Sequence, residues 1–369
     1  MDHLDVVSRL AADLVRLDSR SFVSNLGVAD RIEQELDGFE VERLDYLDAA
    51  GVAKRCLVAV RGTGGLALSG HMDTVPDTGW TDNAWSGRID GDTLHGLGST
   101  DMKGPVAAII AAVRALPAAV PVALLLTTDE ETTKQGAALI AERSQLARRF
   151  APRAILVAEP TGMHPVRGHR SHIEFLATST GVQAHSSTGR GRNANWALLP
   201  YLSALQAVFD RLRSDPTLQD QAYDPPFSDF NLVLDNFGTA LNVTVPKAVA
   251  RVKYRYSARI DPAPIVAAVR EAAEAAGLAL DVRQDAPPPE LAEDHPWVRQ
   301  CVALTGHAAR TAPYGTDAAE LQALAPCIIM GPGDIGVAHA PGEAVSLSEL
   351  AAAIPVFMRL AEAVAGRNG

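Results

Sequence analysis

The pattern of hydrophobic positions predicts an α/β protein in the first half of the chain. Leu4 to Leu17 repeat apolar residues at helical spacing, which is typical of a surface helix. Continuous apolar runs then alternate with helical stretches, as expected of strands buried on both faces. The predicted helices span 4–17, 26–36, 104–116 and 136–146, and the predicted strands span 39–44, 56–60, 66–68, 121–127 and 154–158. Asp90-Gly91-Asp92 predicts a hairpin turn. The alternation of strands and helices predicts a mostly parallel sheet.

The pattern changes near His169. Predicted strands at 172–180, 230–234, 249–260 and 278–283 and predicted helices at 195–213 and 264–276 follow in the order β-α-β-β-α-β. That is the order of a ferredoxin-like module. A stiff, extended proline-rich segment, Asp285-Ala-Pro-Pro-Pro289, suits a domain boundary. Beyond it, 297–304 and 346–364 are predicted helices and 326–330 a buried strand. We therefore expect a catalytic domain of residues 1–168 and 285–369, with a domain of residues 169–284 inserted.

Composition narrows the class of protein. A chain of 369 residues that is 47% hydrophobic can bury a large core and form two domains. The net charge of -11 argues against a nucleic-acid or anionic-membrane partner. Cys56, Cys301 and Cys327 form no CxxC pair, which is typical of core residues in a reducing compartment. No apolar run reaches the about 18 residues of a membrane span, and the acidic, amphipathic N-terminus is not that of a signal peptide. We expect a soluble, cytoplasmic protein.

Five residues are candidate metal ligands: His71, Asp101, Glu131, Glu159 and His339. Most of them follow predicted strands or precede predicted helices, where an open α/β sheet forms its crevice. Zinc accepts imidazole nitrogen and carboxylate oxygen, and a pair of zinc ions needs a bridging anion. Asp101 is the predicted bridge. His71 and Glu159 would then complete one ion, and Glu131 and His339 the other.

Two acidic neighbours of these candidates have predicted roles of their own. Asp73 lies two residues from His71 and is predicted to accept the second ring N–H, which fixes the tautomer. Glu130 precedes Glu131 and is predicted to face the reacting water as general base and then general acid.

Each of these signals alone has a plainer explanation. His71 and Asp73 could belong to a surface turn, and the acidic pair Glu130-Glu131 could be a solvated helix N-terminus. Asp101 could be a helix N-cap, Glu159 could lie in an ordinary loop, and His339 could be an ordinary buried histidine. Their combination, in this order and each in the expected context, favours a metal site.

The motifs together resemble a known family. The chain is similar to the dizinc amidohydrolases and metallopeptidases that include acetylornithine deacetylase, succinyl-diaminopimelate desuccinylase, aminoacylase and glutamate carboxypeptidase. The motifs that carry the resemblance are Ser69-Gly-His-Met-Asp-Thr-Val-Pro76, Gly96-Leu-Gly-Ser-Thr-Asp-Met-Lys-Gly104, Thr128-Asp-Glu-Glu131, Glu159-Pro160, Gly181-Val-Gln-Ala-His-Ser-Ser187 and Ala338-His-Ala-Pro-Gly-Glu343. The resemblance covers nearly the whole chain. It implies a zinc-hydrolase catalytic domain with an inserted ferredoxin-like domain that acts as a lid and dimerises.

The resemblance also implies roles for particular residues. It makes His71, Asp101, Glu131, Glu159 and His339 ligands of two zinc ions, which cobalt can replace, with Glu130 as base and Asp73 as orienting residue. It implies a cis peptide at Asp101-Met102. In the inserted domain it implies that His185, from the partner of a homodimer, stabilises the oxyanion, whereas the residues alone favour a turn-capping surface histidine. Asn242 and Arg259 would hold the substrate carboxylate, and Thr316 would lie in a substrate-side loop.

The implied reaction is hydrolysis of the amide bond of an N-acyl-L-amino acid. The spacing of Asp129-Glu-Glu-Thr-Thr-Lys-Gln-Gly-Ala137 is most similar to the acetylornithine deacetylase branch. This favours N²-acetyl-L-ornithine as substrate and a place in arginine biosynthesis. Gly342, Arg192 and Asn195 differ from the residues usual in this family, which leaves the preference among substrates open. The alternatives are acetylcitrulline deacetylation, succinyl-diaminopimelate desuccinylation and dipeptidase or glutamate carboxypeptidase activity. A non-enzymatic small-molecule-binding member is the alternative of another class.

Overall fold

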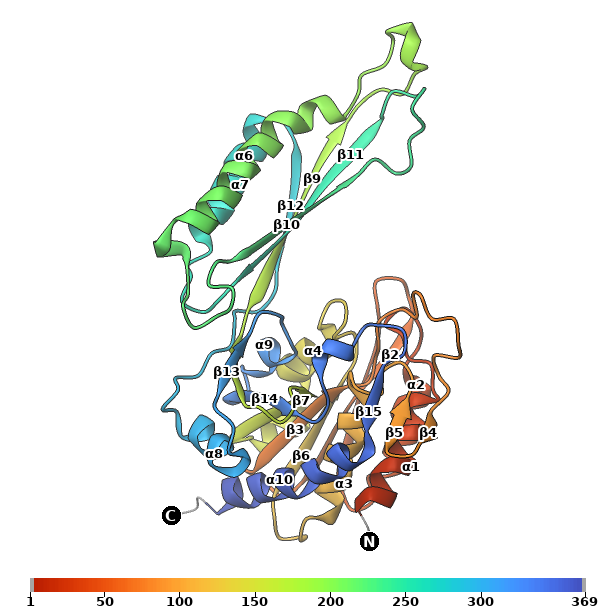
Figure 1. Cartoon of the computed structure of the whole chain (residues 1–369), viewed down its shortest axis with the longest axis vertical. Helices are drawn as coiled ribbons and strands as arrows, with labels where there is room; N and C mark the ends of the chain where they lie inside the picture. Colours follow the sequence, from red (N-terminus) through yellow and green to blue (C-terminus); the bar gives the residue numbers. More distant parts are fainter. Residues whose placement is uncertain (1–2, 367–369) are drawn as a thin grey trace. The chain divides into compact units, whose positions relative to one another are not determined.

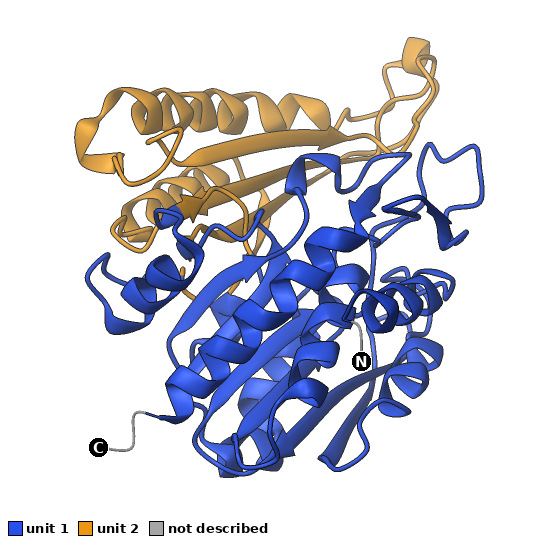
Figure 2. Cartoon of the chain, turned by 60° about the horizontal axis from the view of Figure 1, so that its bottom comes forward, with its two compact units in different colours: residues 1–168, 289–310, 316–369 blue, residues 169–288, 311–315 orange. Residues whose placement is uncertain are grey.

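The structure is a computed structural model that describes residues 3–366, so the outermost residues of the predicted catalytic domain lie outside it. The chain forms two compact units (Figure 2). Unit 1 contains the residues up to Gly168, Pro289–Arg310 and the residues from Thr316 onward, and unit 2 contains His169–Pro288 and Thr311–Gly315. Unit 2 therefore extends beyond residue 284. The reason is local, because the N–H of Asp285 donates to the carbonyl of His172 and the hydroxyl of Ser171 to the carbonyl of Ala286.

A mixed sheet of eight strands runs through unit 1 in the order β1-β2-β6-β3-β7-β14-β8-β13. The strands are β1 Glu40–Leu47, β2 Ala53–Arg61, β3 Leu66–His71, β6 Val122–Thr127, β7 Ala154–Pro160, β8 Val166–His169, β13 Arg310–Ala312 and β14 Cys327–Gly331. Strands β6, β3, β7 and β14 are parallel, and β1 and β2 add antiparallel pairs at one edge. Every residue of the four parallel strands is buried, which confirms the prediction from their continuous apolar runs.

Helices complete the core of unit 1. The helices are α1 His3–Val15, α2 Leu26–Glu33, α3 Lys103–Ala115, α4 Gln135–Arg143, α5 Gln145–Phe150, α8 Pro296–Thr305, α9 Ala318–Leu321 and α10 Leu347–Ala365. Helices α1, α3 and α10 pack against one another and share one hydrophobic cluster with the sheet (Figure 1). Cys56, Cys301 and Cys327 are buried and free, as predicted. Among the described residues, no helix combines the length and hydrophobicity needed to cross a bilayer.

The structure differs from the predicted elements at two serines. The predicted helix 136–146 is two helices, because Ser144 has an extended backbone and its hydroxyl accepts the N–H of Ala147 as the N-cap of α5. The predicted strand 249–260 ends at Tyr256. Ser257 begins a turn there, in which its carbonyl accepts the N–H of Ile260.

A small sheet with the order β15-β5-β4 lies beside α10 in unit 1. Its strands are β4 Arg88–Asp90, β5 Thr93–His95 and β15 Ala344–Ser346. The antiparallel pairing of β4 with β5 confirms the hairpin predicted at Asp90-Gly91-Asp92. The addition of β15 was not predicted, since three residues carry no readable alternation.

Unit 2 has the element order β9 Ser171–Thr180, α6 Asn195–Ser214, β10 Asp229–Asp235, β11 Lys247–Tyr256, α7 Ala263–Ala275 and β12 Ala279–Gln284. Its sheet has the order β10-β11-β9-β12, and all neighbours are antiparallel. Helices α6 and α7 pack against each other and share a second hydrophobic cluster with the sheet. This topology confirms the predicted ferredoxin-like module.

Short 3₁₀ helices occur in unit 2 at Ser186–Thr188 and Pro216–Leu218, and in unit 1 at Ile335–Val337.

Candidate metal centre

The five candidate ligands of unit 1 come from segments that the sheet brings together. His71 is the last residue of β3, and Glu159 lies near the end of β7, which pairs in parallel with β3. Glu131 follows β6, the other parallel neighbour of β3, and Asp101 lies just before α3. His339 follows the 3₁₀ helix between β14 and β15. Parallel strands end at one edge of a sheet, so their terminal side chains converge there.

Asp101 lies between two imidazoles. Its Oδ1 is 3.1 Å from Nε2 of His71, and its Oδ2 is 3.1 Å from Nε2 of His339. Oε1 of Glu159 is 3.9 Å from Nε2 of His71, whereas Oε1 of Glu131 is 3.0 Å from Nε2 of His339. Ligand atoms of His71, Asp101 and Glu131 all lie within 4.8 Å of one another, so these three could hold one metal ion.

The charges of this cluster also fit a cation. Burial raises the pKa of Glu159 and of Glu131, and the charge of Asp101 raises both further. Hydrogen bonds to Asp101 and Glu131 raise the pKa of His339 to about 10. Several carboxylates are therefore removed from water at short distance, with two imidazoles as their nearest partners. Buried charges need pairing or metal coordination, and imidazole nitrogen with carboxylate oxygen is a donor set for zinc.

The tautomer of His71 is fixed by the chain itself. Its Nδ1–H donates to the backbone carbonyl of Asp73 at 2.9 Å, which leaves Nε2 facing Asp101. The prediction named the Asp73 carboxylate as acceptor, but its Oδ1 is farther from Nδ1, at 3.7 Å. The carboxylate instead accepts the hydroxyl of Ser21 at 2.8 Å and the N–H groups of Glu130 and Glu131 at 3.2 and 3.3 Å. Asp73 thus contacts both His71 and the acidic loop after β6.

The Glu130 carboxylate has no hydrogen-bond partner within residues 3–366. Burial raises its pKa well above the ordinary glutamate value, although the charge of His71 opposes this. A carboxylate with a raised pKa and no partner can accept a proton and release it again. Glu130 therefore has the properties of a general base and acid.

Glu343 positions Asp101, a role that the sequence did not reveal. Its buried carboxylate accepts the N–H groups of Gly98, Thr100 and Asp101 at 3.1, 2.8 and 3.0 Å. Burial raises the pKa of Glu343 to about 7. The peptide Asp101-Met102 is cis, as the resemblance implies. Glu343 lies in the motif that contains His339, which was the available signal for its importance.

A buried ion pair holds the loop that carries Glu130 and Glu131. Nζ of Lys54 is 2.8 Å from Oδ1 of Asp129, and the hydroxyl of Tyr46 donates to Oδ2 of Asp129 at 2.7 Å. Asp129 has a left-handed backbone, with φ of 63°. The ion pair between Lys54 and Asp129 was not predicted, because a lone lysine at the start of a strand has no local pattern that indicates a distant partner.

Replacing Lys54 with methionine is expected to destabilise the protein by about 3–5 kcal/mol, because Asp129 would keep a buried charge without its partner. Urea unfolding followed by circular dichroism measures this. Lys253→Met is the matched control, since the side chains of Lys253 and Glu174 are 35% and 36% exposed and such pairs contribute about 0–1 kcal/mol. Equal unfolding midpoints for the two variants would show that the buried pair has no special role.

The residues predicted to contact the substrate do not belong to the cluster of candidate metal ligands. His185, Asn242 and Arg259 belong to unit 2, and all three are exposed. Segments 185–187 and 242–243 are neighbours, because the N–H of Ser186 donates to the carbonyl of Asn242. Nδ1 of His185 accepts the hydroxyl of Ser187 at 2.8 Å, which is the turn-capping role that the residues alone favour. The functional roles of these three residues stay predictions.

Thr316 belongs to unit 1, where it is buried and its hydroxyl accepts the N–H of Ala318 at the start of α9. The neighbouring Asp317 is also buried, and it accepts a hydrogen bond from the hydroxyl of Thr127 at the end of β6. Thr316 therefore has a structural contact that does not depend on substrate.

Imidazoles and buried carboxylates at the ends of parallel strands are a donor set that a metal-dependent hydrolase could use, and beside them Glu130 has no partner among the described residues. Comparison with known proteins narrows this class. The chain belongs to peptidase family M20/M25/M40, whose sequence profile matches residues 67–363. The protein is thus a hydrolase of a family that generally binds metal ions.

Relatives agree with this assignment, and solved structures share the fold. An acetylornithine deacetylase from Myxococcus xanthus is 32% identical over 383 residues, covering 97% of both chains. One from Yersinia pseudotuberculosis is 34% identical over 304 residues, covering 78% of this chain and 76% of the relative. The dipeptidase Dug1p from Saccharomyces cerevisiae has the same fold, with a TM-score of 0.75, 14% identity and full coverage of both chains. The metallo-carboxypeptidase Sso-CP2 from Sulfolobus solfataricus gives 0.73 at 15% identity, covering 96% of this chain and 98% of that one.

Proposed function

We propose that the protein hydrolyses the amide bond of N-acyl-L-amino acids and that N²-acetyl-L-ornithine is its preferred substrate. The observation that carries the hydrolytic part is the position of Asp101, whose two oxygens each face a different imidazole. The substrate is supported by the relatives named acetylornithine deacetylase, one of which aligns over nearly the whole chain. A non-enzymatic role is disfavoured, because Glu130 and all five candidate ligands are present.

We further infer that the chain holds two zinc ions. His71, Asp101 and Glu159 would hold one, and Asp101, Glu131 and His339 the other. When bound, such a pair supplies Lewis acidity that polarises the acyl carbonyl and increases the acidity of water. Cobalt accepts the same nitrogen and oxygen donors and is expected to substitute.

The residues of the chain then account for the proton transfers. Glu130 accepts a proton from the water whose oxygen attacks the acyl carbon. It returns that proton to the amide nitrogen as the carbon–nitrogen bond breaks, which releases acetate and a free α-amino acid. Asp73 holds Glu130 in place through the N–H that it accepts. By resemblance, a donor at His185 stabilises the oxyanion.

The substrate would be recognised through its carboxylate. By resemblance, Asn242 and Arg259 bind the substrate carboxylate, for which a guanidinium is well suited because it pairs with both oxygens. By the same resemblance, Thr316 would lie in a substrate-side loop.

A panel of substrates tests the proposal. With added zinc, kcat/KM is expected to be highest for N²-acetyl-L-ornithine among N-acetyl-amino acids, N-succinyl-diaminopimelate and dipeptides. A missing or extra polar contact in a substrate pocket changes the free energy behind kcat/KM by about 1–3 kcal/mol, which is roughly 5- to 150-fold in kcat/KM. Preference for acetylcitrulline, for the succinyl substrate or for dipeptides would assign the specificity to one of the alternatives. No hydrolysis of any member would contradict the proposal itself.

We also propose that unit 2 forms a homodimer through β10. This strand is at one edge of its sheet, and Leu232, Val233 and Leu234 are 40%, 52% and 52% exposed. An exposed apolar edge strand offers unpaired backbone groups to a second copy.

Val233→Glu is expected to shift the protein from dimer to monomer in sedimentation velocity, because the new charge would be buried at the edge. Ile89→Glu is the matched control, since Ile89 is 44% exposed on β4 of unit 1. A monomeric wild-type protein at micromolar concentration, or a dimer that survives Val233→Glu, would contradict this contact.

A further inference from the structure

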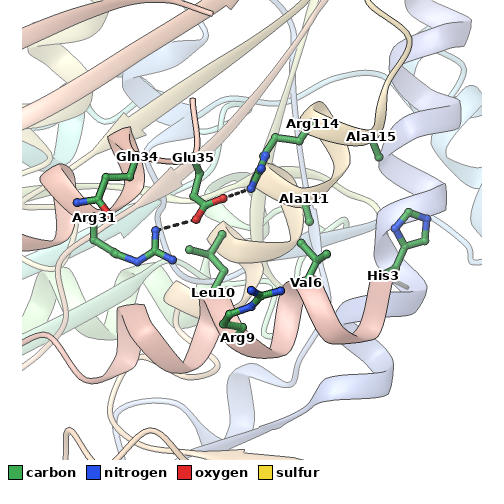
Figure 3. A pocket seen from close by; sticks show the side chains of 10 residues that line it. All are labelled: His3, Val6, Arg9, Leu10, Arg31, Gln34, Glu35, Ala111, Arg114 and Ala115. Atoms are coloured by element: carbon green, nitrogen blue, oxygen red, sulfur yellow. Dashed lines mark hydrogen bonds and ion pairs between the residues drawn. The ribbon is translucent and has the colours of Figure 1, made fainter. Parts of the chain in front are cut away.

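A concave site occurs in unit 1, among residues that have no part in the metal centre. It is a cavity of about 630 Å³ between α1, the end of α2 and the last turn of α3. Val6, Leu10, Ala111 and Ala115 supply an apolar lining. Arg9, Arg31 and Arg114 bring three guanidinium groups to the same cavity (Figure 3). Its volume falls within the range of about 300–1,000 Å³ that is usual for small-molecule sites.

A chain of ion pairs holds one of these arginines in position. Asp13 pairs with Arg31 at 3.0 Å, and Arg31 pairs with Oε1 of Glu35 at 2.8 Å. The other oxygen of Glu35 pairs with Arg114, so that Glu35 lies between the two guanidinium groups (Figure 3). Arg114 is 41% exposed in spite of this contact. Its remaining N–H groups are therefore available to a ligand.

Arg9 supplies a second available cation. It lies on the same face of α1 as Val6, three residues away, and it makes no ion pair or side-chain hydrogen bond within residues 3–366. Glu35 and Asp13, which also pairs with Arg16, supply two negative charges near the three arginines of the cavity, so positive charge is in excess there. That surplus is unusual in a chain with a net charge of -11. The local charge attracts anions, although the whole protein repels them.

We propose that this cavity binds a small organic anion, with its carboxylate or phosphate head between Arg9 and Arg114 and a short aliphatic part on the apolar lining. The planar fork of arginine pairs with two oxygens of either head group. The site is distinct from the metal centre. Arg114 is eleven residues after Lys103 on α3, and at 1.5 Å per residue this places it roughly 16 Å from the end of the helix next to Asp101.

Calorimetric titration of the zinc-loaded protein tests the proposal with three probes that share one aliphatic chain: hexanoate, hexyl phosphate and neutral hexanamide. At least one of the two anions is expected to bind, and hexanamide is not. The better of the two anions identifies the preferred head group. Arg9→Gln and Arg114→Gln are each expected to weaken that binding about tenfold, as for the loss of a partly exposed hydrogen bond to a charged group.

Arg299→Gln is the matched control, because Arg299 is an exposed arginine on α8 of the same unit. It is expected to leave the affinity unchanged. An anion that binds at the metal centre is recognised because it persists in Arg9→Gln. Unchanged affinity in Arg9→Gln, equal weakening in Arg299→Gln, or equal binding of hexanamide would overturn the proposal. None of these results bears on amide hydrolysis, because the experiment measures binding only.

Discussion

Glu130→Gln is expected to lower kcat by about 10²–10⁴-fold, the usual contribution of general acid–base catalysis. Glutamine keeps the size and polarity of the side chain but cannot accept and return a proton. Since Glu130 is not among the proposed ligands, the metal content of the variant should stay at the wild-type value. The measurements are kcat for the best substrate and elemental analysis of the dialysed protein.

Loss of activity together with loss of metal would instead place Glu130 among the ligands. A kcat within about threefold of the wild type would remove its assignment as base, because that change is about 0.65 kcal/mol. Glu362→Gln is a suitable control, as Glu362 is an exposed glutamate on α10 of the same unit.

Asp101→Asn is expected to have the second large effect, because one side chain is proposed to serve both ions. An amide can present one neutral oxygen, so it cannot bridge two cations as a carboxylate does. Removal of either ion takes away charge stabilisation of several kcal/mol, which corresponds to a fall of about 10³-fold in kcat. We expect the variant to retain at most one zinc ion per chain after dialysis.

The exposed Asp90 on β4 provides the control Asp90→Asn, which should keep wild-type zinc content and activity. Retention of two zinc ions by Asp101→Asn would show that another group bridges them. Full activity with a single ion would show that catalysis needs no pair.

Much of this architecture could be predicted because its signals are local. The parallel strands have continuous apolar runs. Candidate metal ligands such as His71 and Glu131 lie at or just after the ends of those runs. The ferredoxin-like order of unit 2 follows from strands and helices that each have a clear period. The hairpin at Asp90-Gly91-Asp92 is likewise defined by its turn residues.

The parts that could not be predicted depend on partners distant in the sequence. Lys54 and Asp129 meet only because β1, β2 and β6 are neighbours in the sheet. Glu343 binds the backbone around Asp101 across more than two hundred residues, and no periodicity indicates that pairing. The same holds for the arginines of the proposed anion site, which come from α1, α2 and α3 and have unremarkable neighbours in the sequence.

The proposed sharing of Asp101 by two cations can be tested directly. Crystals grown with zinc and measured at its absorption edge should show two anomalous peaks, one beside each carboxylate oxygen of Asp101. One of these peaks should adjoin His71 and Glu159, and the other Glu131 and His339. A single peak, or a pair of peaks with no contact to Asp101, would contradict the shared carboxylate and the mechanism that depends on it.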